Sequence, residues 1–303
     1  MIPVPVDSTL ILPDPAASGT TTAVTTGVTA STRAKAQRLR DLSAGPLLVL
    51  PNAWDAGSAA VIAAAGAAAI ATTSGGVSWS HGLGDGQTLG RTDAVEAARR
   101  IVAAVPLPVT VDIEGGYGPD PADVAATVRA MVGAGAVGVN LEDSTAVGGP
   151  LFTPAAQAAR LRAAREAAAA AGLPELLLNA RTDVFLFGIG EESGRLDETL
   201  RRADAYAEAG ADGIFVPGLL DLDLLTALCA RSPLPVNAMA VPGGPTVPAL
   251  AATGVRRISL GTALAQAAYT ATRNAAAELL ATGHHTTLDN ALPFGDLNAL
   301  FHP

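Results

Sequence analysis

Short apolar runs alternate with longer alanine-rich stretches along this chain, from Leu47 to about residue 282. Alternation of this kind predicts strand–helix units whose strands lie parallel in one sheet. Eight runs have the length of buried strands: Leu47–Pro51, Ala68–Thr73, Val109–Ile113, Gly138–Glu142, Leu176–Ala180, Gly213–Val216, Val236–Ala240 and Arg257–Leu260. Eight units in about 250 residues match a TIM-type (β/α)8 barrel in number and in length, so we predict this α/β fold.

The stretches between the predicted strands have the spaced charges of helices. The clearest of them are Thr92–Val105, Pro121–Ala134, Thr153–Ala171 and Leu196–Ala209. We predict N-caps at Thr92, Asp120 and Thr153, because these side chains can accept a hydrogen bond from a free amide of the first turn. Glycines follow several of the stretches and are expected to end the helices in the left-handed conformation.

An open, doubly wound sheet is the competing architecture. Such sheets commonly bind dinucleotides through a glycine fingerprint after the first strand. Here that position holds Asn52-Ala-Trp-Asp55 instead. The barrel is therefore favoured.

The segments that flank the repeating units suggest three regions. Residues 1–30 are rich in Thr, Ser, Ala and Pro and are expected to form a disordered or loosely packed tail. Residues 31–282 hold the barrel, with an extra helix at Arg33–Ser43 and a last helix at 262–282. Residues 283–303 keep several large apolar side chains, so we expect a C-terminal helical extension that docks on its own barrel or is exchanged with a neighbouring subunit.

Charge and composition exclude several classes of partner. The formal net charge of −9 argues against nucleic acid, because phosphate binding requires a basic face. Cys229 is the only cysteine, so we expect neither a disulfide framework nor a thiolate metal site. The first 30 residues lack a basic start and an unbroken apolar core, and no apolar run reaches the roughly 20 residues of a membrane span. We therefore expect a cytoplasmic protein without membrane or nucleic-acid partners.

Carboxylates gather at the ends of two successive predicted strands. Asp112 and Glu114 stand where an apolar strand meets a glycine-rich loop, and Glu142 and Asp143 end the next run. Side chains two residues apart on a strand point to the same face, and the ends of parallel strands meet at one rim. Carboxylate oxygens suit a hard cation, so we predict Mg²⁺ at that rim, with Mn²⁺ as a substitute.

Six short motifs stand at or near the ends of predicted strands. They are Thr73-Ser-Gly-Gly76, Gly84-Asp-Gly86, Val111-Asp-Ile-Glu-Gly-Gly-Tyr-Gly118, Asn140-Leu-Glu-Asp143, Asn179-Ala-Arg-Thr-Asp183 and Gly213-Ile-Phe-Val-Pro-Gly218. In this order they resemble the motifs of the isocitrate lyase / phosphoenolpyruvate mutase superfamily, and the likeness runs from about Leu47 to Tyr269. The resemblance implies a Mg²⁺-dependent barrel enzyme, usually a homotetramer whose last helix is exchanged between subunits.

The resemblance assigns metal-binding roles to four positions. Asp112 matches the principal metal ligand, and Glu114 stands where many members carry Asp. Glu142 matches the acid of the following strand. Asp85 matches an acid that commonly holds a metal-bound water. These four residues are the predicted metal set.

Substrate contacts follow from the resemblance in the same way. The loop Ser74-Gly75-Gly76 matches one whose amides and hydroxyl bind a carboxylate or carbonyl oxygen. Arg181 matches a substrate-binding arginine that would orient a carboxylate during the reaction. Asn237 falls in a motif where members place another polar contact. Trp54, at the end of the first predicted strand, is expected to form a wall of the pocket.

One segment departs from the family pattern. The lyase branch carries a Lys-Lys/Arg-Cys-Gly-His lid after the fourth strand, and its cysteine is the general acid or base. Residues 144–152 of this chain read Ser-Thr-Ala-Val-Gly-Gly-Pro-Leu-Phe, with no Lys, Cys or His. Standard isocitrate or methylisocitrate cleavage is therefore not expected. His81, Tyr117 or bound water could transfer the proton instead.

The residues and the resemblance together predict a Mg²⁺-dependent carbon–carbon lyase. Its small anionic substrate would be a 2-oxo- or 2-hydroxy-(di)carboxylate, cleaved through a metal-stabilised enolate. Two alternatives stay open: a phosphonomutase or a P–C/C–C hydrolase of the same superfamily, and a 2-oxoacid-binding protein without turnover.

Overall fold

The computed structural model describes residues 28–301, so most of the predicted tail at residues 1–30 lies outside the described part of the chain. Nine parallel strands form one sheet in the order β1-β9-β8-β7-β6-β5-β4-β3-β2. The strands are β1 (Leu48–Leu50), β2 (Asn52–Ala53), β3 (Ile70–Thr72), β4 (Val109–Asp112), β5 (Gly138–Glu142), β6 (Leu177–Arg181), β7 (Gly213–Phe215), β8 (Val236–Met239) and β9 (Arg257–Ser259).

The two edges of the sheet are the first two strands of the chain, β1 and β2. Pro51 alone separates β1 from β2, and proline cannot donate to a strand ladder. β1 pairs with β9 while β2 pairs with β3, so the two pieces together take the place of one strand. The predicted TIM-type (β/α)8 barrel is confirmed, and each predicted strand corresponds to a strand of the sheet.

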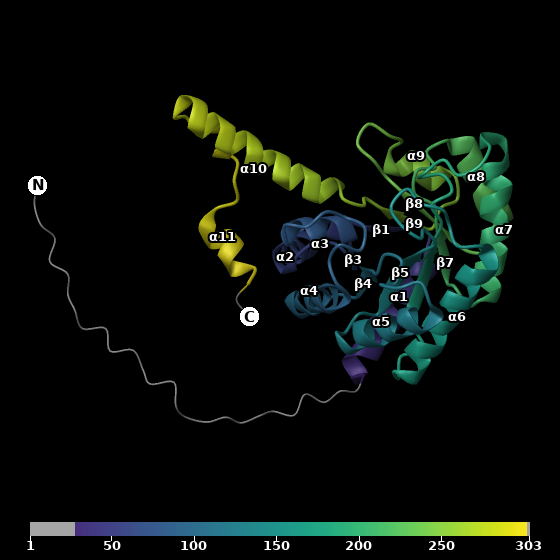
Figure 1. Ribbon diagram of the computed structural model, residues 1–303. Coiled ribbons are helices and arrows are strands. Elements are labelled where there is room, and N and C mark those ends of the chain that lie inside the picture. The colour runs from purple at the N-terminus through teal and green to yellow at the C-terminus, as the bar shows by residue number, and fades with distance from the viewer. Residues whose placement is uncertain (1–27, 302–303) are drawn as a thin grey trace, which may run out of the picture.

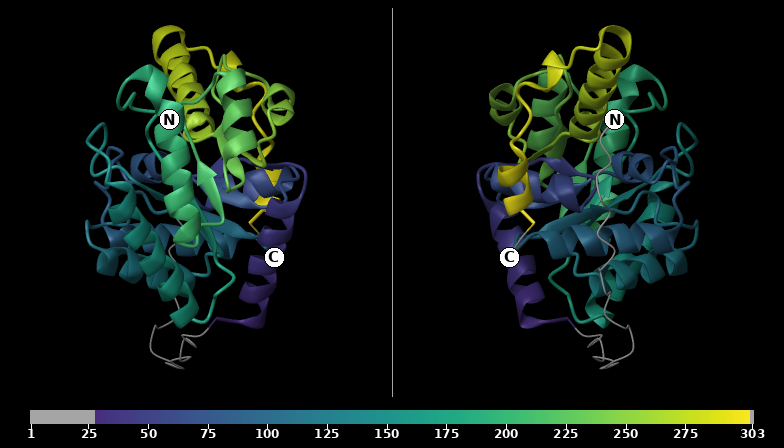
Figure 2. Two further views of the ribbon diagram at one scale, coloured as in Figure 1. Left: turned by 90° about the vertical axis from the view of Figure 1, so that its right-hand side faces the viewer. Right: turned by 90° about the vertical axis from the view of Figure 1, so that its left-hand side faces the viewer.

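Helices surround the sheet (Figures 1 and 2). They are α1 (Ala30–Ala44), α2 (Ala56–Ala64), α3 (Ser74–Ser80), α4 (Arg91–Ala104), α5 (Pro121–Gly133), α6 (Pro154–Ala170), α7 (Arg195–Glu208), α8 (Leu222–Arg231), α9 (Val247–Ala252), α10 (Ala263–Thr282) and α11 (Phe294–Ala299), with 3-10 turns η1 (Glu192–Gly194) and η2 (Thr286–Leu288). Asp120 and Thr153 occupy N-cap positions as predicted, but α4 begins earlier than expected and its N-cap is Gly90 rather than Thr92.

The extra N-terminal helix lies at the amino ends of the strands. Arg40 of α1 donates to Asp212 Oδ1 at 3.0 Å and to the carbonyl of Leu176 at 3.4 Å. α1 therefore lies across part of this end, whereas barrels of this type bind their ligands at the carboxyl ends of the strands.

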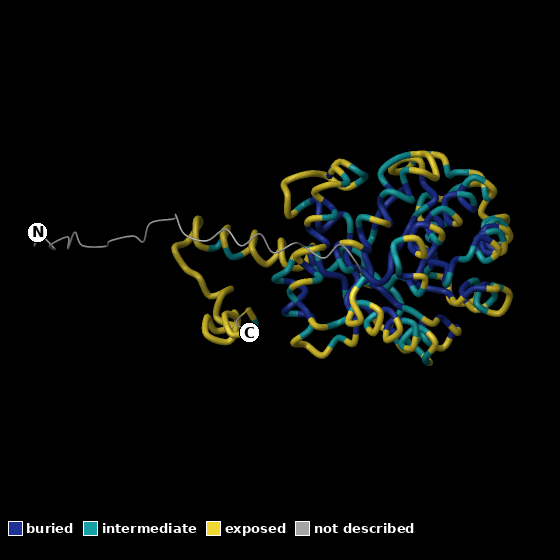
Figure 3. Tube along the Cα trace, turned by 90° about the horizontal axis from the view of Figure 1, so that it is seen from below, coloured by how far each residue is buried: buried dark blue, intermediate teal, exposed yellow. Residues whose placement is uncertain are grey.

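The C-terminal extension stands away from the barrel. α10 projects outward, and the segment that follows it folds back beside it as an exposed strip (Figures 1 and 3). Leu280 of α10 is 86% exposed and Phe294 of α11 is 84% exposed. The extension therefore leaves these apolar side chains unburied on its own barrel. None of the helices between residues 28 and 301 combines the length and apolar character that crossing a bilayer requires.

Candidate active site

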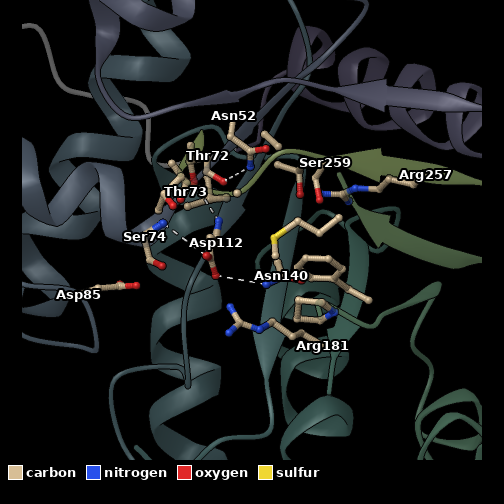
Figure 4. Close-up of a pocket in the computed structure, with 18 of the residues that line it drawn as sticks. Asn52, Thr72, Thr73, Ser74, Asp85, Asp112, Asn140, Arg181, Arg257 and Ser259 are labelled. Atoms are coloured by element: carbon tan, nitrogen blue, oxygen red, sulfur yellow. Dashed lines mark hydrogen bonds between the residues drawn. The ribbon is translucent and has the colours of Figure 1, made fainter. Parts of the chain in front are cut away.

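A cavity of about 220 Å³ lies at the carboxyl ends of the strands (Figure 4). We call it the rim cavity. Its lining is Asn52, Ala71, Thr72, Thr73, Ser74, Asp85, Thr110, Val111, Asp112, Asn140, Arg181, Leu186, Phe215, Pro217, Met239, Arg257, Ser259, Gly261 and Thr262. Barrels of this type bind substrates at this end, because the loops that follow the strands converge there.

Asp112 ends β4 and is held in the rim cavity by three donors. Its Oδ1 accepts hydrogen bonds from Asn140 Nδ2 and from the amide of Glu114, both at 3.2 Å. Its Oδ2 accepts from the amide of Ser74 at 3.4 Å. Three donors from three different strand ends fix the direction of this carboxylate, which Figure 4 shows beside Ser74.

Glu114 turns away from the rim cavity and ties two loops together. Its carboxylate accepts hydrogen bonds from the amide of Gln87 and, at 3.3 Å, from Tyr117 Oη, while the amide of Tyr117 donates to Gln87 Oε1 at 2.9 Å. All three residues have left-handed backbones, with φ of 59° at Gln87, 49° at Glu114 and 60° at Tyr117. Such conformations are costly for residues other than glycine and concentrate at functional sites. This triangle holds the Asp85 loop against the end of β4.

Negative charge at this rim is poorly compensated. Burial raises the pKa of Glu114 to about 7, and the charges of Asp112 and Asp85 raise it further while the amide of Gln87 opposes the shift. Burial, with the charge of Glu114, also raises the pKa of Tyr117 far above its ordinary value, so that its hydroxyl keeps its proton. Mutual repulsion between carboxylates favours a cation between them.

Arg181, at the end of β6, is clamped by two carboxylates. Its Nη1 lies 2.9 Å from Glu142 Oε2, and its Nε and Nη2 donate to the two oxygens of Asp183 at 2.6 and 3.2 Å. Burial alone would lower the pKa of Arg181, but the charges of Glu142 and Asp183 raise it above its ordinary value. Asp183 also accepts from Ser144 Oγ at 2.5 Å. The guanidinium is therefore charged, oriented and already paired.

The Ser74-Gly75-Gly76 segment forms the first turn of α3, and its glycines permit very close packing. A Cβ on Gly75 would lie 2.9 Å from Thr262 Cγ2 and 3.0 Å from Asp85 Oδ2. A Cβ on Gly76 would lie 2.8 Å from Trp54 Cβ. Glycine is needed here because it lets Asp85 and the start of α10 approach the cavity.

Four side chains predicted to take part in catalysis or substrate binding lie outside the rim cavity. Trp54 and His81 share a different cavity, which is lined by the start of α2, the end of α3 and α4. There His81 is exposed, and its Nδ1 lies 3.0 Å from the carbonyl of Val77. Tyr117 lies behind Asp112 with Glu114. Asn237 lines a cavity at the amino ends of the strands, and neither polar atom of its side chain has a partner within the described range. The structure therefore brings none of the four into the rim cavity.

The predicted metal set is only partly assembled. Between residues 28 and 301, no three His, Cys, Asp or Glu side chains are placed to ligate one ion. Asp112 and Asp85 line the rim cavity, whereas Glu114 and Glu142 are engaged by Tyr117 and Arg181. Mg²⁺ is commonly held by one or two carboxylates and keeps several waters. The donor set fits hydrated Mg²⁺ on the two aspartates and does not form a cage of four acids.

Residues 144–152, where the resemblance leads one to expect the lid of the lyase branch, form a short hairpin. Ser144 bridges Leu151, and the amide of Thr145 donates to the carbonyl of Pro150 at 3.0 Å. The exposed Val147 at its tip lies against Gly86, where an added Cβ would meet its side chain. The hairpin thus braces the Asp85 loop. No Cys, His, Tyr or Lys of the described chain lines the rim cavity.

The strands carry polar residues to which the sequence alone assigned no role, although Asn140 and Asn179 head two of the motifs quoted above. Asn140 links Asp112 to Asn179, whose Nδ2 donates to Asn140 Oδ1 at 3.0 Å. Arg257 enters the rim cavity from β9. The sequence did carry a signal for Arg257. It is a charged residue at the start of a predicted strand, and the inward positions of such barrels are usually bulky and apolar.

Comparisons with known proteins agree with this geometry. Residues 39–280 match the family model described as phosphoenolpyruvate phosphomutase. Uncharacterized protein Rv1998c of Mycobacterium tuberculosis H37Rv is 38% identical over 257 residues, which are 84% of this chain and 92% of the relative. The 2-methylisocitrate lyase of Bacillus subtilis is 31% identical over 211 residues, 67% of this chain and 66% of the relative. A proposed phosphonomutase from Burkholderia cenocepacia superimposes with a TM-score of 0.76 at 48% identity, covering 81% of this chain and 99% of that one.

Proposed function

Because this chain belongs to the phosphoenolpyruvate phosphomutase family, we propose that it is a Mg²⁺-dependent lyase that cleaves a carbon–carbon bond of a small 2-oxo- or 2-hydroxydicarboxylate. The observation that carries the proposal is Asp112, oriented by three donors in a strand-end cavity that it shares with Asp85 and Arg181. The similarity to a 2-methylisocitrate lyase supports the reaction class.

Asp112 and Asp85 are the residues that would hold Mg²⁺. When bound, the ion supplies positive charge that stabilises negative charge developing on a substrate oxygen. The planar fork of Arg181 matches a substrate carboxylate, and its two acidic partners hold that fork in place before substrate arrives. Phe215 and Met239 line the same cavity and reduce the space open to water.

No side chain of the rim cavity is left for proton transfer once its two aspartates are assigned to the metal. The lining within residues 28–301 offers carboxylates and arginines but no His, Cys, Tyr or Lys. We therefore assign the proton to water rather than to His81 or Tyr117. Replacing His81 by Gln should then leave kcat unchanged, since this residue lies outside the cavity.

A phosphonomutase is the second candidate, and one observation favours it. Moving a phosphoryl group between carbon and oxygen of one substrate requires no net proton transfer. Such a reaction would therefore proceed without a general acid or base in the rim cavity. The similarity to a proposed phosphonomutase agrees with this alternative.

The two functions are separated by incubating the protein and Mg²⁺ with a panel of malate-type acids, 2-oxoacids and phosphonopyruvate. Release of pyruvate or glyoxylate supports the lyase, and conversion of phosphonopyruvate supports the mutase. Asp112→Ala serves as the inactive control. If no compound turns over but oxalate still raises the melting temperature, the protein binds 2-oxoacids without catalysis and both proposals fail.

The proposed assembly is a cytoplasmic homo-oligomer, a dimer or tetramer, in which α10 and residues 283–301 pack on a neighbouring subunit. The exposed apolar side chains of this segment support the proposal. Tyr269 of α10 adds to them, because it remains 43% exposed although its ring lies edge-on to that of Trp79, with 6.4 Å between the ring centroids. Light scattering after chromatography should give a mass of two or four chains. A single-chain mass would contradict the proposal.

A further inference from the structure

Arg257 is the charged residue of the rim cavity that has no partner. No hydrogen bond or ion pair of its side chain occurs within residues 28–301, and its Nε is buried without an acceptor. In Figure 4 the side chain extends from β9 toward Ser259, on the opposite side of the cavity from Asp85. The charge of Asp112 favours the ionised form of Arg257 and so opposes the lowering of its pKa by burial.

Two hydroxyl groups beside this arginine are also unsatisfied. Ser259 is 3% exposed and Thr110 is 1% exposed, and the side-chain oxygen of each lacks a partner in the described chain. Both residues line the rim cavity. Arg257 and Ser259 are two residues apart on β9, so their side chains point to the same face of the strand. Three polar groups without partners thus face one space.

The strand register places this group in the floor of the cavity. Thr110 precedes Asp112 by two residues on β4, and Arg257 precedes Ser259 by two residues on β9. Since all strands run toward the carboxyl rim, the earlier residue of each pair lies deeper in the barrel. Arg257 also lines the cavity at the amino ends of the strands, which agrees with a deep position.

Arg257 is half-buried between the two cavities that it lines, with its Nε buried. A charge held there without a partner is unfavourable, and the two unpaired buried hydroxyls add to the penalty. Burial lowers the pKa of Arg257 only to about 10, so its guanidinium remains charged at neutral pH. An anion that enters the floor would satisfy the guanidinium and both hydroxyls at once. Arg181 differs in this respect, because Glu142 and Asp183 already neutralise it.

We propose that Arg257, Ser259 and Thr110 form a subsite for the distal carboxylate of the substrate, so that the protein selects dicarboxylates long enough to reach from Asp112 to the floor of the barrel. This inference rests on the proposed function, since it takes the metal-proximal end of the substrate to lie at Asp112. Arg257 is then a specificity-determining residue. A planar guanidinium flanked by two hydroxyl donors matches a carboxylate in shape and in hydrogen bonding.

The test compares ligands that differ in the distal charge. Isothermal titration in Mg²⁺ measures oxalate, which is too short to reach the floor, and the pair succinate and succinamate, which differ by one carboxylate. We expect the wild-type protein to bind succinate at least about tenfold more tightly than succinamate. Arg257→Met should abolish this preference while oxalate binds within about twofold of wild type. Arg256→Met is the matched control, because this neighbouring arginine is exposed and donates to the carbonyl of Pro46.

A second measurement needs no ligand. Methionine has a similar length and no charge, so Arg257→Met should raise the melting temperature of the ligand-free protein by about 2 °C or more. A lower melting temperature would show that Arg257 stabilises the barrel and would overturn the proposal. An unchanged preference for succinate in Arg257→Met would overturn it as well. Failure of the wild-type protein to bind oxalate in Mg²⁺ would refute the metal-dependent function instead. The comparison of succinate with succinamate and the melting temperature of Arg257→Met would still test the subsite.

Discussion

The two sides of the rim cavity carry their positive charge in opposite ways. On the side of β5 and β6, Arg181 is held by Glu142 and Asp183 through contacts of 2.9 and 2.6 Å. On the side of β9, Arg257 has no hydrogen bond or ion pair within residues 28–301. The first arginine is organised before any ligand arrives, whereas the second is stabilised only by a ligand. The difference suggests that one side positions the reacting end of a substrate and the other selects its length.

The organised side depends on a buried network beneath it. Asp143 Oδ2 accepts from Arg202 Nη1 at 2.9 Å and from Tyr206 Oη at 2.7 Å, and Asp143 Oδ1 accepts from the amide of Asp183 at 3.1 Å. Burial raises the pKa of Asp143, and the charge of Arg202 opposes that shift. The network therefore fixes the backbone of Asp183, which in turn orients Arg181.

Removing Asp112 should have the largest effect on the comparison, because both sides of the cavity face this carboxylate. Asp112→Ala is expected to lower kcat/KM by about 10⁴-fold, since it removes the oriented metal ligand. Steady-state kinetics on the substrate found in the panel measures the loss. Turnover close to that of the wild-type protein would remove Asp112 from the site.

Removing Arg202 from the buried network should lower the free energy of unfolding, because the network supports Asp183 and Arg181. Arg202→Met leaves the Asp143 carboxylate buried without its cation, so the free energy of unfolding should fall by about 3–5 kcal/mol. Urea denaturation measures the change. Arg201→Met is the control, because Arg201 is 70% exposed and its pairing with Glu198 should contribute less than about 1 kcal/mol. Equal effects of the two substitutions would contradict the proposed support.

Replacing the planar guanidinium of Arg181 by an ammonium group should affect activity less than the loss of Asp112. Arg181→Lys keeps the charge but loses the planar fork, and the expected rise in KM is about 10- to 100-fold with little change in melting temperature. A KM equal to that of the wild-type protein would mean that Arg181 serves only its ion pairs with Glu142 and Asp183.

Loosening the loop behind Asp112 should have the smallest effect. Glu114→Gln keeps an oxygen acceptor for one neighbour but removes the charge that Gln87 and Tyr117 share. We expect a fall in kcat/KM of about tenfold, because Asp85 is held less firmly. Tyr117→Phe, which removes only the 3.3 Å hydrogen bond, is the matched comparison and should reduce kcat/KM less.

The fold followed from sequence because each strand and helix carries its own local signal. Eight apolar runs separated by helical patterns specify parallel strand–helix units. The first predicted strand, Leu47–Pro51, contains β1 alone, whereas β2 follows Pro51 and was not predicted, without a change to the barrel. The lid departure at residues 144–152 was equally readable, because a missing Lys, Cys or His is a fact of the sequence.

The site was less accessible to sequence reasoning, because depth within a barrel depends on register. The side chains of Asn237 and Met239 point to the same face of β8. Met239 nevertheless lines the rim cavity, whereas Asn237 lines the cavity at the amino ends of the strands. His81 was expected near the rim, but α3 carries it to the outer surface. The missing partners of Arg257 are a property of the packed barrel and have no signal in the chain itself.

The central claim, a Mg²⁺ site on Asp112 in the rim cavity, is tested most directly by titrating Mg²⁺ into the protein in the presence of oxalate. We predict one ion per chain, with binding abolished in Asp112→Ala and retained in Arg257→Met. No measurable uptake of Mg²⁺ by the wild-type protein, or equal uptake by Asp112→Ala, would contradict the claim.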